Sequence, residues 1–324
     1  MMWLLIVGGL IGLIAGGEIL VRGAVGLARK IGVSDLFIGA VLVGFGTSAP
    51  ELVASLNAVS AGSPGIAIGN VIGSNIANTL LVLGMAAVIF PIAANPSALK
   101  RDGMFMLIAS VALVSLIYIN GFSSRLTGIA LVVGLIGMIT YSFWSDRKLA
   151  GGHSETAEMH RDEAEIMDAH DPVWLSAIMA LGGLFGIVLG ANWLISGSVE
   201  LATMIGLSET VIGITIIAIG TSLPELVTCV IASIRKKADV ALGNVLGSNT
   251  FNVMGILGIT SVAMPFDVPF EQISLSRDLG AVAISVIVLL FFAFTGRRLS
   301  RIEGCILLAG YALYIYLLLI GASF

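Results

Sequence analysis

The sequence predicts an all-α protein that crosses a membrane many times. Of its 324 residues, 57% are hydrophobic and only 11% are charged, and the mean hydropathy is +1.05. A soluble domain carries about 25% charged residues, so this chain has too little polar surface to be soluble. Its apolar runs have roughly the 20-residue length of a membrane-spanning helix, and the short alternating strands of a membrane barrel are not visible.

Ten apolar runs are present, and we expect each to form a membrane-spanning helix. No basic segment precedes the first run, which we therefore interpret as a spanning helix and not as a cleaved signal peptide. Cys229 and Cys305 both lie within runs, where apolar packing is a better interpretation than a disulfide or a soft-metal site. In chain order the runs cover 3–28, 36–60, 66–94, 103–120, 126–144, 173–199, 210–234, 240–266, 279–296 and 302–322.

One long polar segment, 145–172, separates the first five runs from the last five. It contains eight of the twenty acidic residues and all three histidines. It lacks the regular acid spacing of an EF-hand, so an acidic solvated linker is favoured over a Ca²⁺-sensing segment. If the N terminus is outside, thirteen of the sixteen basic residues fall on the inner side. The positive-inside rule therefore predicts that both termini lie outside and that the linker is cytoplasmic.

The two sets of runs are related by an internal repeat. The segment Gly46–Glu51 (GTSAPE) returns 174 residues later as Gly220–Glu225 (GTSLPE), and Gly69–Asn75 (GNVIGSN) returns as Gly243–Asn249 (GNVLGSN). After a two-residue insertion the offset becomes 176, so that Arg101-Asp102 matches Arg277-Asp278.

An odd number of spans in each half means that the second half enters the membrane from the opposite side. We therefore expect two inverted five-helix repeats, residues 1–144 and residues 173–324, joined by the linker 145–172. Inverted repeats with interrupted helices are typical of transporters, with the substrate site near the bilayer midplane.

Each GTSxPE motif places a carboxylate inside an apolar run, where a charge is costly and indicates a functional site. Thr47 and Glu51 are four residues apart and so share one helix face, as do Thr221 and Glu225. The proline before each glutamate removes a helical hydrogen bond, which bends the helix and frees a backbone carbonyl.

The second motif adds serine and asparagine at the same spacing of four. These pairs are Ser74 with Asn78 and Ser248 with Asn252. The motifs thus offer only oxygen ligands, which suit Ca²⁺ or Na⁺ and do not suit zinc or copper.

Helix packing is the opposing interpretation, because glycine, serine, threonine and asparagine commonly join membrane helices. The repetition of a glutamate behind a proline favours a cation site. Four further asparagines stay open between orienting the ligands and capping a bend, namely Asn70, Asn75, Asn244 and Asn249. Glu18 and Arg22, four apart in the first run, are interpreted as a structural ion pair in preference to a place on the ion path.

These doubled motifs resemble the alpha repeats of the sodium/calcium exchanger family, most closely those of its prokaryotic calcium/sodium antiporters. The resemblance covers essentially the whole chain. It implies ten helices in two inverted five-helix repeats, with a central cation site formed by the second, third, seventh and eighth helices. It also implies that the first and sixth helices slide as a gate.

The ligand set that the resemblance implies contains ten residues, and backbone carbonyls near Val43 and Ile217 are further candidates. Some family members carry aspartate at the position of Asn252, so this site has two carboxylates where theirs has three. The ten residues are Thr47, Ser48, Glu51, Ser74, Asn78, Thr221, Ser222, Glu225, Ser248 and Asn252.

We therefore expect a secondary antiporter that exchanges Na⁺ for Ca²⁺ by alternating access in the inner membrane of a prokaryotic cell. Proton-coupled antiport of Ca²⁺ or another cation on the same scaffold is the alternative, and a passive cation channel is a further one. A membrane hydrolase is disfavoured, because the spans hold neither a nucleophile with its base nor zinc-type ligands. Na⁺ and Ca²⁺ are then transported substrates in a lipid bilayer, and we expect no cofactor, no nucleic acid and no obligate protein partner.

Overall fold

The computed structural model describes residues 1–93, 96–117, 122–150, 172–204, 218–267, 275–296 and 298–321. Almost all of these residues are helical, which confirms the predicted all-α class. Most of the linker 145–172, with its histidines, lies outside the described residues, and so does Ile217.

Each half begins with a long helix that is followed by shorter helices, several of them interrupted. The first half contains α1 (Met2–Ile31), α2 (Asp35–Ile38), η1 (Gly39–Gly44), α3 (Phe45–Thr47), α4 (Ala49–Ser60), α5 (Pro64–Ile76), η2 (Ala77–Val82), α6 (Leu83–Ile89), α7 (Pro96–Ser115) and α8 (Arg125–Ala150). The second contains α10 (Val173–Met204), α12 (Ala218–Thr221), α13 (Leu223–Ile234), α14 (Ala238–Phe251), η5 (Asn252–Leu257), α15 (Gly258–Ala263), η7 (Leu275–Leu279), α16 (Gly280–Gly296) and α17 (Arg301–Gly321). The segments η1, η2, η5 and η7 are short π-helical stretches within longer helices.

Six helices of the described part are long and apolar enough to cross a membrane, and the bent helix from Asp35 to Ser60 makes a seventh if it counts as one span. The protein is therefore an integral membrane protein. The six are Met2–Ile31, Pro64–Ile89, Arg125–Lys148, Val173–Leu201, Ala238–Ala263 and Arg301–Leu318.

The predicted fourth, seventh and ninth spans overlap α7, α12 with α13, and α16, and residues 210–217 of the seventh span lie outside the described part. Helix α13 has 12 residues and α16 has 17, which is shorter than the roughly 20 residues of a full span. Helix α7 begins at Pro96, before the predicted start at residue 103, and so includes charged residues. The count of ten spans stays a prediction.

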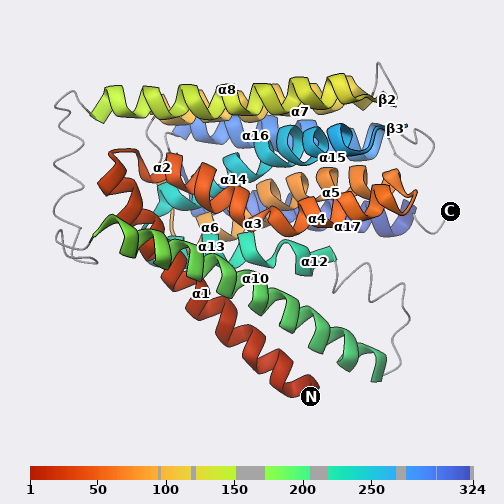
Figure 1. Ribbon diagram of the computed structural model, residues 1–324, viewed down its shortest axis with the longest axis horizontal. Helices are drawn as coiled ribbons and strands as arrows, with labels where there is room; N and C mark the ends of the chain where they lie inside the picture. Colours follow the sequence, from red (N-terminus) through yellow and green to blue (C-terminus); the bar gives the residue numbers. More distant parts are fainter. Residues whose placement is uncertain are drawn as a thin grey trace.

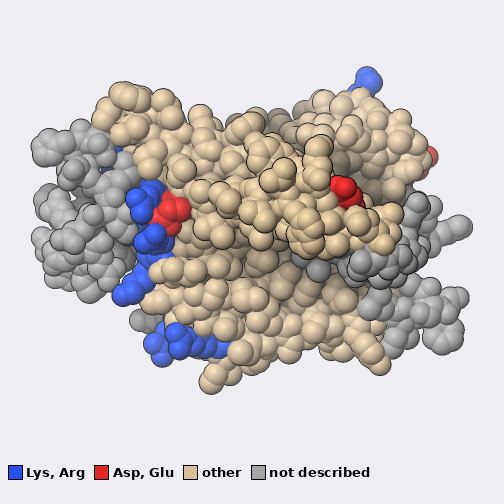
Figure 2. All heavy atoms as spheres, turned by 90° about the horizontal axis from the view of Figure 1, so that it is seen from below, with Lys and Arg blue, Asp and Glu red and all other residues tan. Residues whose placement is uncertain are grey.

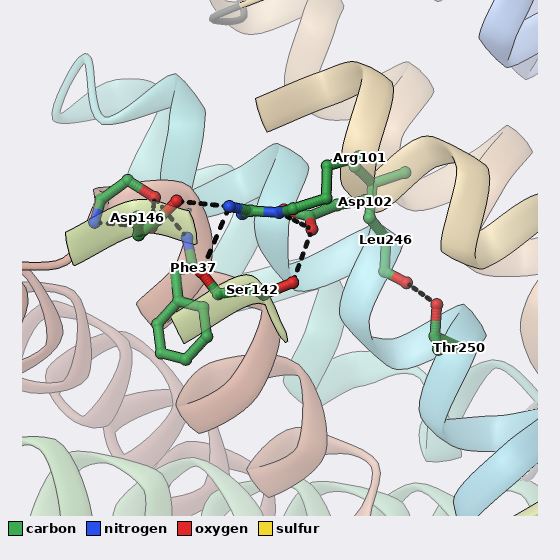
Figure 3. Close-up of polar contacts among 8 residues, drawn as sticks. Phe37, Arg101, Asp102, Ser142, Asp146, Leu246 and Thr250 are labelled. Atoms are coloured by element: carbon green, nitrogen blue, oxygen red, sulfur yellow. Dashed lines mark hydrogen bonds and ion pairs between the residues drawn. The ribbon is translucent and has the colours of Figure 1, made fainter. Parts of the chain in front are cut away.

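Two of the charged residues near the start of α7 belong to a buried charge cluster (Figure 3). The Arg101 guanidinium donates to both carboxylate oxygens of Asp102 at 2.7 and 2.8 Å, and to Oδ1 of Asp146 in α8 at 2.5 Å. Asp146 also accepts from the amide of Ser34 at 2.9 Å and from the Ser34 hydroxyl, and this hydroxyl caps α2. Paired and hydrogen-bonded charges tolerate burial, so the cluster ties α2, α7 and α8 together at one end of the molecule.

Helices α1 and α10 lie side by side and cross the other helices at an angle (Figure 1). Their backbones approach closely at glycines, as is common in membrane proteins. A Cβ atom on Gly9 would lie 2.7 Å from the carbonyl oxygen of Gly190, and one on Gly16 would lie 2.9 Å from that of Gly183. The offset of 174 makes Gly9 equivalent to Gly183 and Gly16 equivalent to Gly190. The two contacts are therefore copies of one contact, with the halves exchanged.

Two small antiparallel sheets repeat this exchange. Strand β1 (Ile92–Ala93) pairs with β4 (Arg298–Leu299), and β2 (Phe122–Ser123) pairs with β3 (Phe266–Asp267). The repeat makes β1 equivalent to β3 and β2 equivalent to β4. Each sheet therefore joins one strand from each half, and the halves are matched in space as well as in sequence.

Glu18 and Arg22 form the ion pair that their spacing predicts, with a Nε to Oε1 distance of 2.6 Å. Arg235, at the end of α13, also contacts Glu18, at 2.7 Å. Lysine and arginine side chains gather mainly at this end of the molecule, where α1 meets α2 and α8 ends (Figure 2).

The packing of α1 on α10 predicts different effects for two glycines of the same helix. A Cβ atom on Gly190 would lie 2.7 Å from the Leu13 amide nitrogen, whereas one on Gly182 would meet nothing within 4 Å. Gly190→Ala should lower the free energy of unfolding by about 1–3 kcal/mol, the usual cost of overpacking. Gly182→Ala should leave it unchanged or raise it slightly. Thermal unfolding in detergent measures both, and equal unfolding temperatures would contradict the assigned contact.

Candidate cation site

The first candidate carboxylate lies just after a break in a helix. The chain runs helically from Asp35 to Thr47, breaks at Ser48 (φ −86°, ψ 6°), and resumes as α4 with a bend of 41°. Pro50 occupies the first turn of α4, where its missing amide hydrogen costs no helical bond. Glu51 also lies in this turn, where the helix N-terminus favours a negative charge. Glu51 is nevertheless only 1% exposed.

The second half repeats this geometry closely. The helix breaks at Ser222 (φ −90°, ψ 4°), and α13 carries Pro224 and Glu225 in its first turn. Glu225 is also 1% exposed. Both breaks fall on the serine two residues before the proline, so the helix is interrupted beside each motif.

The predicted ligands on the four helices are mostly buried, and contacts join several of them across the halves. Ser48 Oγ donates to Glu225 Oε1 at 2.9 Å, and Ser248 Oγ donates to the Gly44 carbonyl at 3.0 Å. Thr221 is half-buried. The buried members are Thr47, Ser48, Glu51, Ser74, Asn78, Ser222, Glu225, Ser248 and Asn252.

The helices that carry these residues pack in an exchanged pattern. Helix α4, with Glu51, packs against η5, which begins at Asn252, and α13, with Glu225, packs against η2, which contains Asn78. Each glutamate-bearing helix thus meets an asparagine-bearing segment of the other half. Val43, whose carbonyl was a further candidate, is buried on η1.

Several buried polar atoms of this region have no hydrogen-bond partner within the described part of the chain. They are Oε2 of Glu51, Oε2 of Glu225, both amide atoms of Asn78, and the Oδ1 atoms of Asn249 and Asn252. A buried polar group without a partner is destabilising by about 1–3 kcal/mol, and by more if it is charged. Most of these atoms are oxygens, so a bound cation would remove the penalty by accepting them as ligands.

The donor set fits a hard cation. No group of three or more histidine, cysteine, aspartate and glutamate side chains capable of holding a metal occurs among the described residues. Two carboxylates must therefore be completed by neutral hydroxyl, amide and carbonyl oxygens. Such a set suits Ca²⁺ and, because Na⁺ is equally hard, Na⁺.

Asn70 and Asn244 donate hydrogen bonds to the backbone carbonyls of the two glutamates. The sequence had left the role of these asparagines open. Asn70 Nδ2 donates to the Glu51 carbonyl at 3.1 Å and to Ser55 Oγ at 3.0 Å. Asn244 Nδ2 makes the equivalent contacts, to the Glu225 carbonyl at 3.5 Å and to Cys229 Sγ at 3.1 Å.

The sequence analysis did not identify Ser55, and it assigned Cys229 to apolar packing, whereas both side chains accept from these asparagines. They are related by the same offset of 174. The repeat could have revealed them if it had been applied to a serine–cysteine pair.

The sodium/calcium exchanger protein family matches residues 1–144 and 175–320 of this chain. The chain belongs to the sodium/calcium exchanger family. The sodium/calcium exchanger MaX1 of Methanosarcina acetivorans is 32% identical and covers 98% of both chains. The inner membrane protein YrbG of Escherichia coli is 32% identical over 97% of this chain and 95% of its own.

Solved structures agree with this assignment. A structure of the sodium-calcium exchanger NCX_Mj soaked with zero Na⁺ and Ca²⁺ matches the chain with a TM-score of 0.81 and 31% identity, covering 97% of each chain. A structure of NCX_Mj soaked with Na⁺ and Sr²⁺ gives a TM-score of 0.80 at 32% identity. This exchanger is therefore an integral membrane antiporter of a family whose transported ions are Na⁺ and Ca²⁺, and that family consists of transporters, not enzymes.

The bonds of Asn70 and Asn244 predict that both side chains stabilise the exchanger. Asn70→Ala and Asn244→Ala should each lower the free energy of unfolding by about 1–3 kcal/mol, because backbone and side-chain acceptors lose a buried donor. Asn57→Ala is the matched control, since Asn57 is exposed on α4. Thermal unfolding of the three variants in detergent gives the comparison, and a loss at Asn57 as large as at Asn70 would contradict the assignment.

Proposed function

We propose that this exchanger uses an inward flow of Na⁺ to move Ca²⁺ outward, with both ions competing for the same two carboxylates. The observation that carries the proposal is the pair Glu51 and Glu225. Both are almost fully buried at helix breaks, and each has a carboxylate oxygen without a hydrogen-bond partner in the described part. Because the same charges cannot serve Na⁺ and Ca²⁺ fully at once, the ions bind alternately, which is the basis of exchange.

The proposed ligands are the ten residues that the motif resemblance implies. Two carboxylates balance the charge of one Ca²⁺, and the remaining ligands supply neutral oxygens. Asn252 contributes an amide oxygen without adding a third charge. The complete set is Thr47, Ser48, Glu51, Ser74, Asn78, Thr221, Ser222, Glu225, Ser248 and Asn252.

We infer that transport proceeds by alternating access between two inverted five-helix repeats, 1–144 and 173–324, which together make ten spans. The exchanged glycine contacts of α1 with α10 and the exchanged pairing of the four short strands support this architecture. A site between two such repeats can open to either side as one repeat moves against the other.

The orientation that we propose places both termini outside a prokaryotic cell membrane and the linker 145–172 inside. Segments that this orientation assigns to the inner side contact one another, since β1 pairs with β4 and Ser34 bonds Asp146. Segments assigned to the outer side do the same, since β2 pairs with β3. The gathering of basic side chains at the proposed inner end agrees with the positive-inside rule (Figure 2).

Proton-coupled antiport is the second candidate. The unpartnered oxygens of Glu51 and Glu225 that support a cation site could also take up protons. A proton gradient would then drive Ca²⁺ movement through the same residues.

The coupling ion can be identified by measuring Ca²⁺ uptake into proteoliposomes that hold an outward gradient of Na⁺, K⁺ or H⁺. We expect uptake with the Na⁺ gradient alone. Uptake driven by a pH gradient without Na⁺ would establish the alternative, and uptake without any gradient would indicate a passive channel.

Glu51→Gln and Glu225→Gln serve as paired controls for this flux, because each keeps the side-chain size and removes one charge of the site. Both should reduce uptake to background while the protein stays monodisperse in detergent. Uptake at the unmodified rate in either variant would show that the pair does not carry exchange.

The proposed orientation predicts where a new thiol can be labelled. Cys305 is exposed and Cys229 is buried, so Cys305→Ser gives a background with low intrinsic reactivity. A cysteine added after Phe324 should react with a membrane-impermeant maleimide in intact cells. Labelling that requires permeabilised cells would place the C terminus inside and reverse the topology.

A further inference from the structure

Four buried asparagines lie beside the proposed ligands, two in each half. Asn75 and Asn78 lie on α5 and η2, and the offset of 174 makes them equivalent to Asn249 and Asn252 on α14 and η5. Their exposed fractions do not exceed 2%. Asn78 and Asn252 belong to the proposed ligand set, whereas Asn75 and Asn249 do not.

The two equivalent pairs are bonded differently. Asn252 Nδ2 donates to Asn75 Oδ1 at 3.0 Å. The equivalent bond in the other half would join Asn78 Nδ2 to Asn249 Oδ1. That bond is not formed, and both of these atoms have no partner among the described residues.

Asn249 instead donates from Nδ2 to Thr79 Oγ1 at 2.7 Å. The residue equivalent to Thr79 is Val253, which has no oxygen on its side chain. The bond between Asn249 and Thr79 therefore has no possible copy in the other half.

We propose that Asn75 and Asn249 are positioning residues that hold the ligands Asn252 and Asn78 in turn. The inference rests on the proposed alternating access. Two related halves can take up each other's conformations, which reverses the side from which the site between them is reached. In this conformation Asn75 holds Asn252 and leaves Asn78 free of protein partners in the described part. In the exchanged conformation Asn249 holds Asn78, and Asn252 is released.

Thr79 makes the two conformations unequal. It adds one hydrogen bond to Asn249 in this conformation, and Val253 cannot give the same bond to Asn75 in the exchanged one. The threonine thus biases the equilibrium toward the conformation seen here, and the bias appears as unequal apparent affinities for Ca²⁺ on the two sides of the membrane.

Two substitutions should shift this bias in the same direction. Thr79→Val removes the extra bond of this conformation, and Val253→Thr supplies the missing bond of the other. Each should change the ratio of the apparent Ca²⁺ affinities measured in inside-out and right-side-out vesicles by about fivefold, the effect of one net hydrogen bond of about 1 kcal/mol. The double variant should show the product of the two shifts.

Thr79→Ser and Thr250→Val are the controls. The serine variant keeps a hydroxyl for Asn249, and among the described residues the Thr250 hydroxyl bonds the Leu246 carbonyl of its own helix, at 2.8 Å. Both should leave the ratio unchanged. The ratio does not depend on the amount of folded protein, so a merely structural role for Thr79 would not move it.

Shifts of Thr79→Val and Val253→Thr in opposite directions, or an unchanged ratio in both, would overturn the inference. Failure of the unmodified protein to exchange Na⁺ for Ca²⁺ would instead overturn the proposed function. The two failures are thus distinguishable in the same vesicles.

Discussion

The burial of Glu51 and Glu225 in apolar helices of a membrane protein is the constraint on which the rest of this structure depends. A carboxylate in the apolar part of a membrane is strongly destabilising unless it is paired, hydrogen-bonded or bound to an ion. The protein meets this cost in part by breaking both helices just before the glutamates, so that each charge lies at a helix N-terminus. Ser48 supplies a hydrogen bond to Glu225 from the other half. The remaining oxygens are satisfied by a transported cation in the proposed mechanism.

Neighbouring helices support the two helices that begin at the breaks. Asn70 and Asn244 provide this support by donating to the carbonyls of the two glutamates and to a side chain one turn further along. The same asparagines fix α5 against α4 and α14 against α13. The glycines of α1 and α10 have a different role, since they let two long helices contact each other through their backbones.

The two halves repeat in sequence but are not equally bonded. Arg101 and Asp102 are buried together with Asp146. The equivalent residues Arg277 and Asp278 also form an ion pair, with a Nε to Oδ1 distance of 2.8 Å, but the Arg277 side chain is 30% exposed. The position equivalent to Asp146 is Ala322, so the second half cannot copy the cluster. Beside the site, Thr79 bonds Asn249, whereas the equivalent residue Val253 has no oxygen with which to form such a bond. Such differences give a repeated architecture two unequal ends.

The sequence by itself determined the membrane class, the internal repeat, and the serine, threonine, asparagine and glutamate positions around the two motifs. These follow from local properties: hydropathy, spacing along a helix, and the effect of proline on the residue four before it. Only the tertiary structure decided which oxygen atoms accept hydrogen bonds from which donors. The contact of Ser48 with Glu225 joins residues that are 177 apart in the sequence. Asn249 bonds Thr79 and not Asn78, and this difference depends on how the helices pack. Neither can be read from spacing, because both are fixed only when the halves come together.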